Sequence, residues 1–109
     1  MIGQARALEL ILTADRMTAE QAYRLGMVNH VVEPDAVLDR ARELAERICR
    51  NAPLAVRESL AIARDALLLT DEQAWERSAA AMDRVRGSDD AREGVTAFIE
   101  KRDPRWTGR

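Results

Sequence analysis

The chain has 109 residues, with 17 basic and 19 acidic side chains and a formal net charge of −2, so it lacks the basic excess typical of nucleic-acid-binding proteins. Its one cysteine, Cys49, excludes an internal disulfide and a cysteine-based metal cluster. No apolar run approaches the roughly 18 residues of a membrane helix, and Met1 is not followed by the regions of a signal peptide, so we expect a cytoplasmic protein with no membrane partner.

Helices dominate the predicted secondary structure from the start of the chain. Nineteen alanines and few β-branched runs favour helix over strand. A first helix is predicted at about residues 4–13, although no capping side chain precedes it. Thr18 and Gln21 can form a capping box that begins a short second helix, and Gly26 is placed to end that helix with a positive φ.

Four further helices are predicted in the rest of the chain. Pro34 favours a helix start close behind it, and residues 35–51 have the clearest apolar period in the sequence. Pro53 suits the first turn of a helix that continues to about residue 69. The residues expected to cap or end the last two helices are Thr70 or Asp71, Gly87, and Ser88 or Asp89.

Residues 27–32 are the one stretch that the sequence predicts to be extended, because three valines lie there. The backbone donors and acceptors of a lone strand need a neighbouring strand or water. Either this chain continues from or docks onto a further segment, or residues 27–32 form a buried loop. The predicted fold class is therefore all-α, with about six helices and one short extended segment, followed by an irregular tail around Trp106.

Few residues offer catalytic chemistry. His30 is the only histidine, and a lone histidine between valines is more often structural than catalytic. Three carboxylates near it in sequence leave a base–carboxylate pair open: Asp15, Glu33 and Asp35. Cys49 lies on the apolar edge of its helix, where we expect core packing. The sequence contains no recognisable nucleophile motif, phosphate-binding glycine loop or metal-ligand spacing.

A helix–turn–helix motif is a weaker interpretation of residues 18–28. The recognition helix of such a motif would have to follow Gly26 and display polar and basic groups to DNA. Residues 27–32 are mostly apolar, and Pro34 follows them closely. We therefore do not expect DNA binding.

Four sequence blocks stand in a fixed order over nearly the whole chain, at residues 2–16, 18–32, 52–56 and 88–106. In their residues and their order they resemble the C-terminal part of the enoyl-CoA hydratase/isomerase (crotonase) superfamily. That family usually has glycine where this chain has Ala14, a departure that bears on a turn and not on chemistry.

The resemblance implies that residues 1–109 correspond to the C-terminal helical region of the crotonase fold, without its N-terminal spiral core. In the family, that core carries an oxyanion hole for the thioester and, in hydratases, two glutamates that add water to 2-enoyl-CoA. These elements lie upstream of the position that matches Ile2. No catalytic residue is transferred, and the chain is expected to be inactive alone.

The resemblance also implies two ligand-binding residues, Phe98 and Lys101. In the family, the last helix reaches a neighbouring subunit's coenzyme A, with an aromatic ring near the adenine and a lysine near the 3′-phosphate. Structural interpretations remain open for both residues, since Lys101 near a helix C-terminus gains from the helix dipole without a ligand. Phe98 belongs to an apolar stripe expected to face inward: Ala91, Val95, Phe98 and Ile99.

The function that the resemblance implies is that of an enoyl-CoA hydratase or isomerase acting on acyl-CoA thioesters in fatty-acid metabolism. Coenzyme A is then part of the substrate, and no other cofactor or metal is expected. The expected partner is a further copy, in a trimer or dimer of trimers, or a polypeptide that supplies the core. The alternative is a non-catalytic helical module that self-associates or binds a partner through uncovered apolar surfaces.

Overall fold

The computed structural model describes residues 2–109, and all the regular secondary structure in this range is helical. The predicted all-α class is therefore confirmed. The chain falls into two compact units, of which the first ends at Ala41 and the second runs from Arg42 to Arg109. Within residues 2–109, no helix is both long and apolar enough to cross a membrane.

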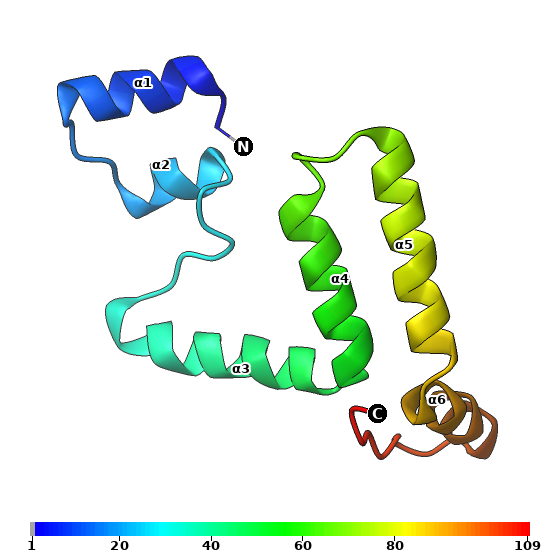
Figure 1. Ribbon diagram of the computed structural model, residues 1–109. Helices are drawn as coiled ribbons and strands as arrows, with labels where there is room; N and C mark the ends of the chain where they lie inside the picture. Colours follow the sequence, from blue (N-terminus) through cyan, green and yellow to red (C-terminus); the bar gives the residue numbers. More distant parts are fainter. Residues whose placement is uncertain (1) are drawn as a thin grey trace. The chain divides into compact units, whose positions relative to one another are not determined.

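The first unit begins with two short helices, α1 (Gln4–Thr13) and α2 (Ala19–Arg24) (Figure 1). The predicted capping box is present at α2. The Gln21 backbone N–H donates to Thr18 Oγ1 at 3.2 Å, and the Thr18 N–H donates to Gln21 Oε1 at 2.9 Å. Gly26 takes a φ of +71° after α2, as expected.

Residues 27–32 do not pair as a strand among residues 2–109, and the alternative of a buried loop is wrong. Within the part of the chain that the structure describes, they have no regular secondary structure and no strand for them to pair with. Their three valines are 37–41% exposed, so the segment is not a buried loop either. The β-branched pattern favours an extended backbone but supplies no pairing partner, and the segment remains a surface loop.

A short 3₁₀ turn, η1 (Pro34–Ala36), leads into α3 (Val37–Cys49). Glu33 before Pro34 is extended, with a ψ of 149°, which fits the restriction that proline places on its predecessor. The division between the two units falls within α3. The predicted helix over residues 35–51 is thus confirmed, with its first turn wound more tightly.

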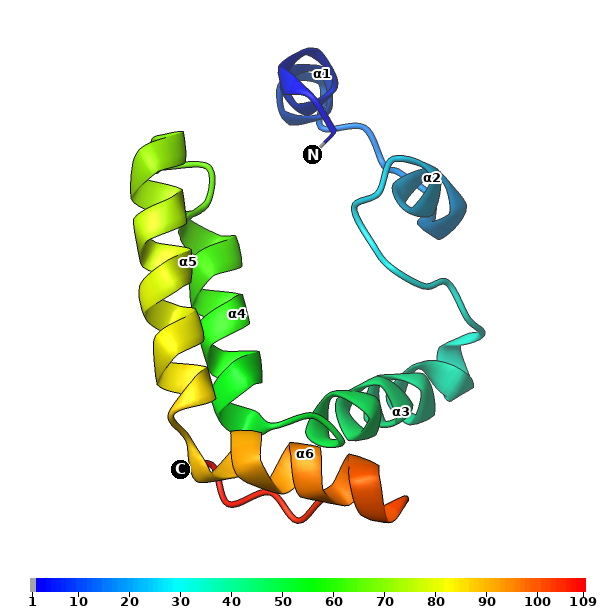
Figure 2. The same ribbon diagram turned by 90° about the vertical axis from the view of Figure 1, so that its right-hand side faces the viewer.

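In the second unit, α4 (Pro53–Asp65) and α5 (Asp71–Arg86) lie side by side (Figures 1 and 2). Arg84 of α5 binds both carboxylate oxygens of Glu58 at 3.0 and 2.7 Å. Arg77 binds Asp65 at 2.6 Å. Because the later residue of α5 pairs with the earlier residue of α4, the two helices are antiparallel.

The last helix, α6 (Asp89–Glu100), packs against α5 after a two-residue turn. Ser88 is its N-cap, because the Ser88 side chain accepts a hydrogen bond from the Ala91 N–H at 3.0 Å. Ala81 of α5 and Ala97 of α6 are the buried apolar residues of the described chain, 3% and 2% exposed.

Several side chains expected to pack inward are exposed. On α6, Val95, Phe98 and Ile99 are 62%, 85% and 73% exposed, so the predicted inward stripe is wrong for this chain. Cys49 is also exposed, which contradicts its expected place in a core. An apolar helix face is buried only when another element covers it, and no element among residues 2–109 covers these positions.

Candidate functional site: the end of helix α6

The predicted ligand-binding residues lie at the C-terminal end of α6. Phe98 occupies the last turn of the helix, and Lys101 directly follows its final residue, Glu100. The Phe98 side chain is 85% exposed, which excludes core packing against the rest of this chain. The structure therefore presents an aromatic face and an exposed lysine three residues apart.

Lys101 ends α6 in a left-handed conformation, with a φ of +54°. Its backbone N–H donates to the Phe98 carbonyl at 3.3 Å, and the N–H of Arg102 donates back to Ala97 at 3.1 Å. This pattern is a Schellman motif, which usually places glycine where Lys101 stands. The backbone of Lys101 is therefore fixed by the termination of the helix.

Arg102 connects this turn to two carboxylates of α6. Its Nη1 and Nη2 bind Glu93 at 2.6 and 3.1 Å, and its Nε binds Glu100 at 2.5 Å. Glu93 also accepts a hydrogen bond from the Arg105 backbone N–H at 2.6 Å. The hydrogen bonds from Arg102 and then from Arg105 lower the pKa of Glu93 to about 2.

The C-terminal tail, residues 103–109, is irregular as predicted but is firmly tied to the second unit. Asp90, 1% exposed, accepts hydrogen bonds from the N–H groups of Thr107 and Gly108 at 2.6 and 2.9 Å. These bonds, the Thr107 one first, lower the pKa of Asp90. Trp106 donates from its indole Nε1 to the Arg50 carbonyl at 2.8 Å, which links the tail to the residue following α3.

The sequence did not predict the hydrogen bonds that attach this tail to Asp90 and Arg50. An aspartate early in a helix is typical of any helix N-terminus, so nothing in the pattern distinguished Asp90 as the acceptor for residues 17 positions later. One signal was available, since Gly94 stands in the middle of an otherwise regular helix. A Cβ at Gly94 would lie 3.3 Å from the Trp106 ring, so the glycine makes room for the tail.

The histidine and cysteine candidates are not brought into a catalytic arrangement. His30 Nε2 lies 3.3 Å from Arg40 Nη2, so its recorded neighbour is a guanidinium and not one of the carboxylates considered from the sequence. Cys49 is exposed at the last position of α3. Within residues 2–109, no group of three or more histidine, cysteine or acidic side chains is placed to hold a metal ion.

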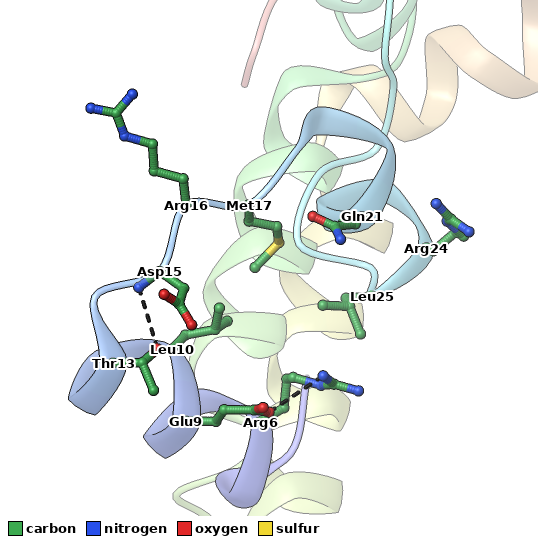
Figure 3. A pocket seen from close by; sticks show the side chains of 10 residues that line it. All are labelled: Arg6, Glu9, Leu10, Thr13, Asp15, Arg16, Met17, Gln21, Arg24 and Leu25. Carbon is green, nitrogen blue, oxygen red and sulfur yellow. Dashed lines mark hydrogen bonds and ion pairs between the residues drawn. The ribbon is translucent and has the colours of Figure 1, made fainter.

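A shallow pocket in the first unit lies between α1 and α2 (Figure 3). Leu10, Met17 and Leu25 face its interior, whereas Arg16 and Arg24 extend away from it. Glu9 at its edge is paired with Arg6 at 3.3 Å. The polar groups do not converge on one point, so the pocket is not arranged as a reaction centre.

Comparison with known proteins identifies the family. The sequence model of the enoyl-CoA hydratase/isomerase family matches residues 1–109, so the chain belongs to this family. The carnitinyl-CoA dehydratase of Salmonella arizonae is 43% identical over 104 residues, covering 92% of this chain and 40% of the relative. The crotonyl-CoA hydratase of Syntrophomonas wolfei is 37% identical over 102 residues, covering 94% of this chain and 39% of the relative.

The fold agrees with this assignment. The crystal structure of an enoyl-CoA hydratase from Bacillus anthracis matches with a TM-score of 0.94 and 34% identity, covering 99% of this chain and 42% of that one. The predicted resemblance to the helical C-terminal part of the crotonase superfamily is thereby confirmed. The chain spans about 40% of the length of the curated relatives it matches.

Proposed function

We propose that this chain is the helical module of an enoyl-CoA hydratase or isomerase, acting on acyl-CoA thioesters as part of a homo-oligomer or with a partner that supplies the core. In this function Phe98 stacks on the adenine of coenzyme A and Lys101 binds its 3′-phosphate. The observation that carries the proposal is the end of α6, where Phe98 is 85% exposed beside an exposed lysine. An exposed ring offers a stacking face, and an ammonium offers a mobile charge for a phosphate.

Coenzyme A binding by the 109-residue polypeptide tests the two residues directly. We expect Lys101→Ala and Phe98→Ala each to weaken binding in an NMR titration. Arg64→Ala and Trp75→Ala are matched controls, since Arg64 is an exposed cation on α4 and Trp75 an aromatic on α5 that is 77% exposed. If the controls weaken binding as much as the site variants do, the proposed contact is wrong.

Catalysis is proposed to require elements that the resemblance places before the position matching Ile2. The purified 109-residue polypeptide is therefore expected to leave crotonyl-CoA unchanged. The measurement is the absorbance of the double bond conjugated to the thioester, which hydration removes, compared with a buffer blank. Turnover above the blank would show that the polypeptide itself carries the acid and base groups.

A cytoplasmic location is part of the proposal. It is supported by the match to the enoyl-CoA hydratase/isomerase family. Localisation of a tagged, full-length gene product would test it.

A second candidate function, a self-associating or partner-binding module, is favoured by the exposed surface. The chain exposes 9210 Å². Two well-packed proteins of the size of its two units, one ending at Ala41 and the other spanning the rest, would together expose roughly 7,300 Å². The chain therefore exposes more surface than compact proteins of this size do. Size-exclusion chromatography with light scattering, with and without coenzyme A, separates the two functions: assembly indifferent to coenzyme A favours the module.

A further inference from the structure

The guanidinium of Arg102 binds two acidic side chains of α6 that precede Lys101 along the chain. Glu100 directly precedes Lys101, and Glu93 lies two helical turns earlier on α6. Arg102 binds Glu93 through two nitrogens at 2.6 and 3.1 Å and Glu100 through a third at 2.5 Å. Planar, bidentate contacts of this kind are those that arginine forms and lysine cannot.

The side chain of Lys101, in contrast, makes no hydrogen bond or ion pair with any residue from 2 to 109. It is also the only lysine in the sequence. A carboxylate beside an ammonium on the same turn would attract it and compete with an external anion. Two carboxylates of α6, those of Glu93 and Glu100, are already engaged by Arg102.

We infer that Arg102 is a positioning residue: by pairing with Glu93 and Glu100 it keeps both carboxylates away from Lys101 and leaves the ammonium available to a phosphate monoester. This inference rests on the proposed function, in which that phosphate is the 3′-phosphate of coenzyme A. Arg102 does not touch the ligand in this role. Arg102 affects the ligand only through the net charge around Lys101.

The electrostatics of Glu93 are consistent with this role. Its pKa is lowered to about 2, first by Arg102, so Glu93 is fully charged at neutral pH. Removing the guanidinium would leave Glu93 and Glu100 as two unpaired negative charges on the helix that ends at Lys101. Replacing the two glutamates by glutamine would remove those charges while keeping an oxygen that can accept from the Arg105 N–H.

Because the chain has a single lysine, reductive ¹³C-methylation labels Lys101 as the one side-chain amine, together with the N-terminal α-amine, and its charge is retained. The labelled protein is titrated with coenzyme A and with dephospho-coenzyme A, which lacks the 3′-phosphate. We expect the wild type to prefer coenzyme A roughly fivefold, the upper range for an exposed ion pair. Arg102→Gln should abolish that preference, and the triple variant R102Q/E93Q/E100Q should restore it.

The triple variant distinguishes an electrostatic role of Arg102 from a purely structural one. If Arg102 only anchored the turn, the triple variant would not recover the preference, since it has lost the same contacts; that result would overturn the inference. An unchanged preference in Arg102→Gln would also overturn it and leave the proposed function intact. A wild type with no preference would refute the proposed phosphate contact and the inference with it. Far-UV circular dichroism of each variant establishes that α6 is folded.

Discussion

The buried carboxylate of Asp90, at the second position of α6, accepts a hydrogen bond from the backbone N–H of Thr107 at 2.6 Å. The Asp90 N–H in turn donates to the carbonyl of Arg109 at 3.1 Å. The start of α6 is thereby bound to the last residues of the chain, while Glu93 holds Arg105. The tail thus returns along the helix that carries Phe98 and Lys101.

Asp90→Asn is expected to release this tail. An asparagine can accept one of the two backbone N–H groups, but its amide nitrogen would then face the other, donor against donor. We expect the fraction of molecules with an undocked tail to rise roughly tenfold, since hydrogen bonds to a charged acceptor are the stronger ones. Trp106 fluorescence in a Trp75→Phe background measures the docking. Asp89→Asn, an exposed neighbour on the same helix, is the control and should leave docking unchanged.

Acid is expected to undock the tail at low pH only. Glu93 and Asp90 have lower pKa values in the folded state than their ordinary values of 4.5 and 3.8. The contribution of Glu93 to stability is therefore complete above about pH 4.5 and is lost as the pH falls toward 2, and that of Asp90 is lost as the pH falls below 3.8. A pH titration of the Trp106 signal tests this expectation. A transition between pH 7 and pH 5 would contradict it.

Gly94 provides a steric test of the same contact. A Cβ there would lie 3.3 Å from the Trp106 ring, so Gly94→Val should displace the indole and red-shift its emission. Gly94→Ala should have a smaller effect, because the gain in helix propensity, about 1 kcal/mol, offsets part of the crowding. Val95→Ala, on an exposed position of α6, serves as the control. An unshifted emission in Gly94→Val would show that the ring does not pack there in solution.

Ala14→Gly is expected to stabilise α1. Ala14 ends this helix at a φ of +54°, a conformation that glycine adopts without the steric cost of a Cβ. We expect a gain of roughly 0.5–1 kcal/mol in the local opening free energy of α1, measured by amide exchange. Ala5→Gly within the same helix should show the opposite sign. Faster exchange in Ala14→Gly would contradict the strain argument.

The sequence predicted the elements whose causes are local. The capping box of Thr18 with Gln21 forms as predicted, and Thr70 and Ser88, each one of two expected cap residues, are the N-caps of α5 and α6. Each of these caps depends on residues within one turn. The sequence could not predict contacts between residues that are far apart along the chain. The same apolar pattern that predicts a helix face cannot say whether a partner covers it, and so Phe98 was expected inside and lies outside.

At the candidate site, too, some residues were predicted from the sequence and others were not. Phe98 and Lys101 were found through resemblance, and their contact with a ligand stays a prediction. The pairing of Arg102 with Glu93 spans nine residues and crosses a helix end, where neither helical nor strand periodicity applies. Asp90 and Trp106 likewise bind residues 17 and 56 positions away, and no local sequence pattern predicts contacts of that length.

The burial of little besides Ala81 and Ala97 has a calorimetric consequence. Heat capacity and denaturant sensitivity of unfolding both scale with the apolar area that is newly hydrated. As a lone monomer, this polypeptide would therefore melt over a wide temperature range and respond weakly to urea. A sharp, cooperative transition would signal that oligomerisation, and not the single chain, supplies its tertiary stability.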